Sequence, residues 1–327
     1  MDSSHKENGL NLFCHNHSSF KTTFGIISLY KFSFPYWLEK FLLALEYIQL
    51  LSLTILIHPS IPDLSYSNLK NPFLFEVISY FFKLANPSYL LSFENTDATT
   101  RACLAIIFGF TIFKYLVLLH IVYKATFNKS PNNLLKSLWR CLFKLQGRVI
   151  CYFISSFWVR TIISTSYGTF SIPGMSNRAL VSISVALLVI EYLLSFHLEI
   201  QVCDFRPTKQ YLASKNFEMP ILTLLQKFII QIVQLFVYEN ISVGIWVCIM
   251  INLLLSVIRE YRFFKTLPFY QYKALIYQGD LIAIMLSLHI AHLFHEIVKS
   301  SDYSKDVGFR FLIMLWSIFG IMSCKLS

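Results

Sequence analysis

The sequence predicts an all-α membrane protein: a bundle of about eight transmembrane helices with both termini on the cytoplasmic side. Of its 327 residues, 55% are hydrophobic, 17% aromatic and 14% charged, and the mean hydropathy is +0.56. A soluble domain carries about 25% charged residues. The apolar residues come in continuous runs of helical length, and in lipid only helices or closed barrels satisfy the backbone polar groups. We therefore expect an integral, multi-pass membrane protein.

Eight apolar segments have about the length that a helix needs to cross a bilayer, which is roughly 20 residues. Residues 1–35 are polar and mixed in character and are predicted to form a cytoplasmic tail. The rest of the chain, 36–327, is predicted to form the helix bundle. The predicted spans are 41–58, 102–123, 149–166, 179–200, 220–238, 241–258, 280–298 and 309–324, of which the last is the shortest.

The basic residues of the connecting segments orient this bundle. Cytoplasmic loops of membrane proteins carry an excess of Lys and Arg. With the N-terminus inside, 18 basic residues fall on the cytoplasmic side and seven on the other. The seven are Lys70, Lys83, Arg101, Arg178, Lys299, Lys305 and Arg310. The net charge of +10 therefore points to anionic lipid at the cytoplasmic face rather than to nucleic acid.

Two further segments are predicted to lie at the membrane surface rather than to cross it. Residues 73–92 are apolar but interrupted by charged residues and by Asn86-Pro87, which favours one or two helices at the outer interface. Residues 132–148 are amphipathic, with leucines on one face and a basic stripe on the other, a pattern typical of a helix in the cytoplasmic headgroup layer. A calmodulin-like protein partner would recognise the same pattern. The basic stripe consists of Lys136, Arg140, Lys144 and Arg148.

The sequence contains no motif of a known catalytic or cofactor-binding class. G-x-S-x-G, Walker and H-E-x-x-H motifs are absent, and so is an aromatic-basic pattern for nucleic acid. The seven cysteines are scattered and form no C-x-x-C pair, which argues against a disulfide framework or a zinc knuckle. We therefore expect no enzymatic activity, no cofactor and no nucleic-acid partner.

Several stretches resemble one known family. They are LEYIQLLSL (44–52), SIPDLSYS (60–67), FKLQGRVICYFISSFWVRTI (143–162) and REYRFFKTLPFYQYKALIYQGDLIAIML (259–286). Together they resemble the N-terminal membrane half of the large multi-pass proteins of ciliates related to the tiny macrocysts B family. In that family the membrane half precedes a long cytoplasmic part, often with PAS-type sensor domains. The resemblance implies a membrane module for signalling or scaffolding and brings no active site with it.

Four ionisable residues inside predicted spans are candidate functional residues. Charged groups inside a membrane are costly and usually face the bundle interior. A rise of 1.5 Å per residue places these four within about 5 Å of one common depth near the midplane. One interpretation is an ion channel or proton-coupled transporter; the other, which we favour, is a set of ion pairs that fixes the order of the helices. The four residues are Glu46, Lys114, Glu191 and Lys227.

The stretch LHIAHLFHE (288–296) places three histidines and an acid on one helical face, within an arc of about 120°. Such a face can bind a metal, respond to pH, or pack as polar residues inside the bundle. A metalloenzyme site needs further ligands from other helices, so we favour packing. The residues are His289, His292, His295 and Glu296. Four amide residues are also expected to hydrogen-bond across helices: Gln226, Gln231, Gln234 and Asn252.

Overall fold

The computed structural model describes residues 34–55, 80, 83–91, 93, 97–126, 137–138, 141–142, 144–202, 218–237 and 241–300. All the regular elements in these ranges are helical, as the sequence predicts. They are α3 (Tyr36–Ile55), η2 (Pro87–Leu90), α6 (Ala98–Thr126), η3 (Gln146–Ile150), α8 (Cys151–Ser166), α9 (Asn177–Val202), α10 (Glu218–Val237), α11 (Ile241–Thr266) and α12 (Tyr272–Ser300).

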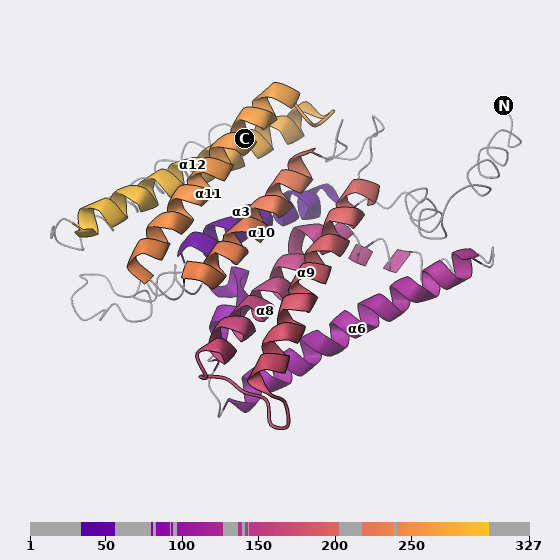
Figure 1. The fold of residues 1–327 in the computed structure, drawn as a ribbon. Helices are drawn as coiled ribbons and strands as arrows, with labels where there is room; N and C mark the ends of the chain where they lie inside the picture. The colour runs from indigo at the N-terminus through magenta and orange to yellow at the C-terminus, as the bar shows by residue number, and fades with distance from the viewer. Residues whose placement is uncertain are drawn as a thin grey trace, which may run out of the picture.

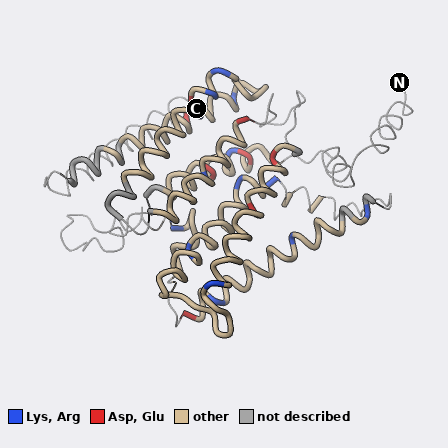
Figure 2. The backbone as a smooth tube through the Cα atoms, in the orientation of Figure 1, with Lys and Arg blue, Asp and Glu red and all other residues tan. Residues whose placement is uncertain are grey.

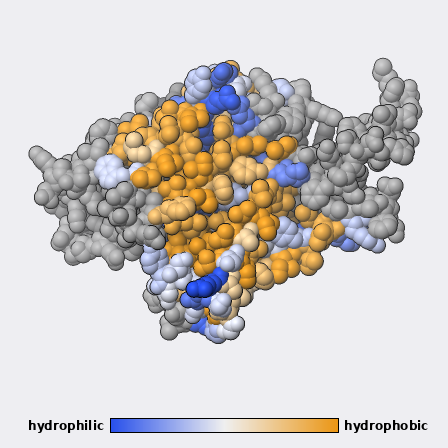
Figure 3. Space-filling model, viewed as in Figure 1, coloured by the Kyte–Doolittle hydropathy of each residue, from blue (hydrophilic) through white to orange (hydrophobic). Residues whose placement is uncertain are grey.

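Five of these helices are long and apolar enough to cross a membrane: α6, η3 continued by α8, α9, α10 and α12. Apolar side chains form a broad band across the face shown in Figure 3, with hydrophilic residues at two opposite ends of the band. Helices α3 and α11, two further predicted spans, are not among the five. The eighth predicted span, 309–324, lies outside the described residues, as does the polar tail up to residue 33.

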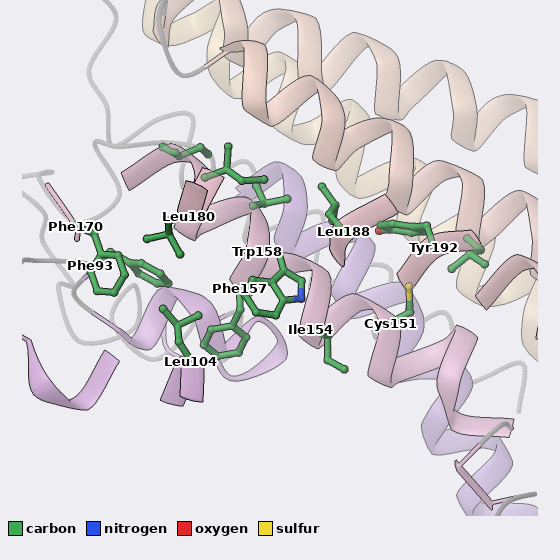
Figure 4. Close-up of a cluster of buried hydrophobic side chains, with 14 residues drawn as sticks. Phe93, Leu104, Cys151, Ile154, Phe157, Trp158, Phe170, Leu180, Leu188 and Tyr192 are labelled. Carbon is green, nitrogen blue, oxygen red and sulfur yellow. The ribbon is translucent and has the colours of Figure 1, made fainter. Parts of the chain in front are cut away.

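The helices pack in two groups that share α10 (Figure 1). In the first group α8 lies beside α9, and a cluster around Trp158, Phe157 and Tyr192 fills the space between them, α6 and α10 (Figure 4). In the second group α3, α11 and α12 enclose a cluster that includes Leu50 and Met285. Because α10 contributes Leu224 to the first cluster and Met219 to the second, it joins the two groups.

Local signals explain where several helices begin and end. Asp97 precedes α6 and accepts a hydrogen bond from the backbone N–H of Thr99 at 2.9 Å, as an N-cap residue does. Gly168 follows α8 with φ +71°, a left-handed conformation that costs glycine little. Leu267 ends α11 with φ +41°, and Pro268 cannot continue the helix. The Leu-Pro-Phe-Tyr stretch is thus a short link between α11 and α12.

Helices α11 and α12 are longer than predicted, and this moves several charged residues from loops into helices. The sequence predicts spans that end at 258 and begin at 280, whereas the link covers only residues 267–271. A helix of 26 residues is about 39 Å long, more than the roughly 30 Å hydrocarbon core. Hydropathy detects only the apolar middle of such a helix. Arg259, Arg262 and Lys265 consequently belong to α11, and Lys273 to α12.

The two predicted surface segments are described in part. In 73–92, the stretch Pro87–Leu90 forms a short 3-10 helix, in which Ser88 is buried, and the preceding Asn86 is buried too. In 132–148, the last residues form a π-helix that leads directly into α8. A π-helix carries one extra residue per turn and is frequent at functional sites. Lys136 and Arg140 lie outside the described residues.

Candidate functional site

Apart from Glu39, the buried charges of the described residues form two groups. Charged residues otherwise gather toward the ends of the helices (Figure 2). The first group, which we name the α6–α9 ion pair, consists of Lys114 and Glu191. The second, which we name the polar core, lies between α3, α10, α11 and α12 and consists of Glu46, Gln49, Gln226, Lys227, Asn252, Ser256, Arg259 and His289.

In the α6–α9 ion pair, the Lys114 ammonium lies 2.6 Å from both carboxylate oxygens of Glu191. The Lys114 side chain is 3% exposed and that of Glu191 is fully buried. Gln146, the first residue of η3, completes the arrangement, because its Nε2 donates to Glu191 Oε1 at 2.5 Å and its Oε1 accepts from Lys114 Nζ at 3.2 Å. Three residues from three separate elements therefore satisfy one another in a closed hydrogen-bonded ring.

Lys227 is the basic residue of the polar core that the sequence also identified. Its ammonium is fully buried and donates to Gln49 Oε1 at 3.0 Å and to the Arg148 carbonyl oxygen at 2.7 Å. The nearest oxygen of Glu46 lies 3.7 Å away. The structure therefore joins Lys227 with Glu46, and Lys114 with Glu191. Of the two lysines that the sequence offers as partners for Glu191, Lys114 is the one in contact.

Two basic residues of the predicted surface stripe also contact the bundle. Lys144 forms an ion pair with Glu39 of α3, which is almost fully buried. Arg148 lies in η3, where its carbonyl oxygen binds Lys227. The C-terminal half of the stripe thus packs against α3 and α10, so any lipid surface would have to be formed mainly by Lys136 and Arg140.

Close packing surrounds the π-helix. Gly147 lies directly against Glu199 of α9, and a Cβ atom at this glycine would lie 2.2 Å from Glu199 Oε1 and 2.6 Å from its Cγ. A Cβ atom at these distances cannot be accommodated in the present arrangement, so alanine at this position would force the Glu199 side chain into another conformation or move α9 away. Sequence reasoning had no signal for this contact, because Gly147 stands 52 positions before its neighbour.

His289 is the one member of the histidine face whose side chain the structure describes. It is buried, and its Nδ1 lies 2.7 Å from the Met285 carbonyl oxygen, which only accepts. Nδ1 therefore carries the proton, and Nε2 accepts from Asn252 Nδ2 at 2.5 Å. With both ring nitrogens engaged, His289 has none left for a metal in this conformation.

The histidine face as a whole is only partly visible. The helical arrangement of 288–296 is confirmed by α12, but the side chains of His292, His295 and Glu296 lie outside the described part. Among the side chains that the structure does describe, no three His, Cys, Asp or Glu residues come together as a metal site requires.

Amide side chains link the helices, as the sequence predicts. Asn252 accepts at Oδ1 from Gln226 Nε2 at 2.5 Å, which joins α10 and α11 and continues the hydrogen-bonded chain from His289 of α12. Gln231 accepts from the Tyr192 hydroxyl at 2.8 Å, and Gln234 donates to the Leu53 carbonyl at 2.9 Å. All four amide residues therefore take part in cross-helix hydrogen bonds, as expected.

Arg259 is the buried residue that sequence reasoning missed. It is 1% exposed and the largest of the fully buried side chains in the described part of the chain. The predicted span stops one residue before it, which assigns it to a cytoplasmic loop. Its position in a buried polar core follows only from the longer helix α11.

The chain matches no family model, and comparison with curated proteins and solved structures gives no significant match.

Proposed function

We propose that the chain is a polytopic membrane module of about eight spans that serves signalling or scaffolding and performs no catalysis. The α6–α9 ion pair supports this proposal most directly. Its charges neutralise each other, and Gln146 occupies the remaining hydrogen-bonding positions, so the arrangement locks helices together rather than leaving a charge free to bind a moving ion. The resemblance to the membrane half of tiny macrocysts B-like proteins points to the same role.

The polar core favours a second candidate function, an ion channel or proton-coupled transporter. Lys227 and Arg259 lie there with a hydrogen-bonded chain through Gln226, Asn252 and His289. Ionisable groups in the membrane interior often mark ion or proton pathways. Discontinuous helices, which transporters commonly use around such a site, are not found in the described parts of α10, α11 and α12.

A flux measurement separates the two candidates. The purified chain is placed in liposomes that contain a pH-sensitive dye, and a proton or salt gradient is applied. The proposed function predicts the same leak as in empty liposomes. A gradient-driven flux that disappears in a correctly folded Lys227→Met variant would contradict it and establish the transport function instead.

The scaffolding role itself is tested by the size of the assembly in cells. After crosslinking in its own membrane and gentle solubilisation, the 38.1 kDa chain should elute in complexes with other proteins. Elution as a chain bound only to detergent and lipid would contradict a scaffolding role, whatever the flux result.

For the orientation, we propose that both termini and the segment 124–148 face the cytoplasm. The charge count of 18 against seven supports this. The triplet at Asn128 (Asn-Lys-Ser) should then receive no glycan in cells, and protease added to the non-cytoplasmic side should spare the region near Lys136. A glycan at Asn128 would show that the segment 124–148 faces away from the cytoplasm, and it would contradict the proposed orientation.

For the segment 132–148, we propose attachment to anionic lipid at the cytoplasmic face. Each Lys or Arg near such a surface contributes about 1 kcal/mol. In an isolated peptide, where the contacts of Lys144 and Arg148 with the bundle are absent, replacement of all four residues of the basic stripe by Gln should therefore lower the affinity for anionic vesicles roughly a thousandfold. The unchanged peptide should bind zwitterionic vesicles only weakly. Equal binding of both peptides to anionic vesicles would argue against the lipid role and leave a calmodulin-like partner as the alternative.

A further inference from the structure

Arg259 occupies an unusual electrostatic position. It lies on α11 seven residues before the helix ends at Thr266, about 10 Å along the helix axis from that end. Its guanidinium is buried, and it keeps its charge at any physiological pH. Removing such a charge from water costs several kcal/mol unless an opposite charge and hydrogen bonds compensate for it.

The described residues provide little of this compensation. No carboxylate oxygen of theirs lies within 4.0 Å of the guanidinium, whereas Lys114, Lys144, Lys227 and Arg262 each have such a partner. Nη1 reaches only the Thr223 hydroxyl at 3.5 Å, the outer limit of a hydrogen bond, and Nη2 lies 3.1 Å from the Met285 sulfur. A thioether is a weak acceptor. The third donor atom, Nε, is buried without a partner.

The charged residues of the surrounding helices do not compensate for the charge of Arg259 either. Among the described side chains of α3, α10, α11 and α12, the buried charged residues are Glu39, Glu46, Lys227 and Arg259. Glu39 pairs with Lys144 and Glu46 lies next to Lys227. Among the described side chains of these four helices, Arg259 is therefore the buried charge without a carboxylate beside it.

The geometry of the unfilled donors indicates what would fit. Nε and Nη2 form one edge of the guanidinium, and this edge can donate two parallel hydrogen bonds to an oxyanion. The face of the guanidinium is covered by the Tyr47 ring, whose centroid lies 4.5 Å away. Tyr47 also binds Gln278, whose Oε1 is buried without a partner and can accept from a hydroxyl. Met285 is an unbranched, flexible side chain that can move away from Nη2.

We propose that the Nε–Nη2 edge of Arg259 binds a phosphate oxyanion between α3, α10, α11 and α12, and that the Met285 thioether occupies its place when it is absent. A phosphate group offers oxygens to the guanidinium and, when protonated, a hydroxyl to Gln278. The phosphate can belong to a soluble compound or to a lipid headgroup, since the chemistry is the same. The site goes beyond the signalling or scaffolding function and does not depend on it.

Two measurements on the intact chain test this site. In the first, delipidated protein in maltoside micelles is titrated with sodium phosphate, with sodium chloride of equal ionic strength as reference, and binding is followed by calorimetry. In the second, native mass spectrometry records which phospholipids remain bound after purification. Saturable phosphate binding identifies a soluble source, and a retained phospholipid identifies a headgroup.

Variants decide whether Arg259 is responsible. Arg259→Gln should lower the phosphate affinity at least tenfold, or remove the retained lipid. Arg262→Gln changes an arginine on the same helix that is paired with Glu218, and it should stay within twofold of the natural chain. If Arg259→Gln does not fold, two other variants replace it. Arg259→Lys keeps the charge but lacks the Nε–Nη2 edge, so it should weaken binding. Met285→Leu removes the competing sulfur, so it should strengthen binding. The proposal would be overturned if the natural chain bound neither phosphate nor phospholipid, or if all variants bound equally well.

Discussion

Glu191→Gln is expected to reduce the yield of folded protein in detergent more than any other single change considered for this chain. It removes the only carboxylate in contact with Lys114 among the described residues and leaves a buried, uncompensated ammonium. Breaking a buried ion pair from one side typically costs about 3–5 kcal/mol. Size-exclusion chromatography of a fluorescent fusion, together with thermal unfolding, measures the loss.

The matched control uses the two lysines. Glu191→Gln combined with Lys114→Met should recover much of the yield, because no unpaired charge then remains. Glu191→Gln combined with Lys227→Met should fall further, because Lys227 lies next to Glu46 and its removal exposes a second unpaired charge. Recovery with Lys227→Met instead would show that the pairing in the structure is wrong. Normal folding of Glu191→Gln, with loss of an ion or proton flux, would favour the transport function.

Gly147→Ala is expected to destabilise the bundle by about 1–3 kcal/mol, the usual cost of forcing an extra methyl group into a packed interior. The new Cβ would overlap the Glu199 side chain as far as its Cγ, so a rotation of the carboxylate alone does not relieve the contact. Glu199 has to adopt another side-chain rotamer, or α9 or the π-helix has to shift. Thermal unfolding of the purified variant measures the effect.

Gly109→Ala is the control for this prediction. Gly109 lies in α6, where a Cβ would meet nothing within 4 Å, and alanine is the better helix former. This variant should be neutral or slightly stabilising. In a double-mutant cycle, Gly147→Ala should cost less in a Glu199→Ala background. An equal cost in both backgrounds would mean that Glu199 is not the obstacle.

The sequence predicts the existence of the helices well and their ends poorly. Runs such as 179–200 and 220–238 differ from α9 and α10 by only one or two residues at each end, because the apolar run fills almost the whole helix. For α11 and α12 the helices continue into charged residues such as Arg259 and Lys273, where hydropathy carries no signal. The π-helix was also not predicted, since a repeat of four residues in 132–148 indicates an ordinary α-helix.

The pairing of the candidate site residues could not be predicted from the sequence. Residue counts along the spans bring Glu46, Lys114, Glu191 and Lys227 to one level, but depth does not tell which helices are neighbours. The choice between Lys114 and Lys227 depends on Glu191 of α9 facing Lys114 of α6 while Lys227 of α10 lies beside α3, which is a property of the packing. The burial of Arg259 was not predicted, because the predicted span ends at residue 258, one residue before it. The spacing of the histidines alone likewise could not predict the buried hydrogen bonds of His289.

The α6–α9 ion pair also has a consequence for the order of synthesis. Lys114 precedes Glu191 by 77 residues, which at 5–20 residues per second takes about 4–15 s to translate. During this interval α6 has to enter the membrane with an unpaired lysine, at a cost of about 2.5–3.5 kcal/mol against the many apolar residues around it. Gln146 is made 32 residues after Lys114 and is the first partner to arrive. The ion pair that holds α6 against α9 can therefore form only after Glu191 has been synthesised.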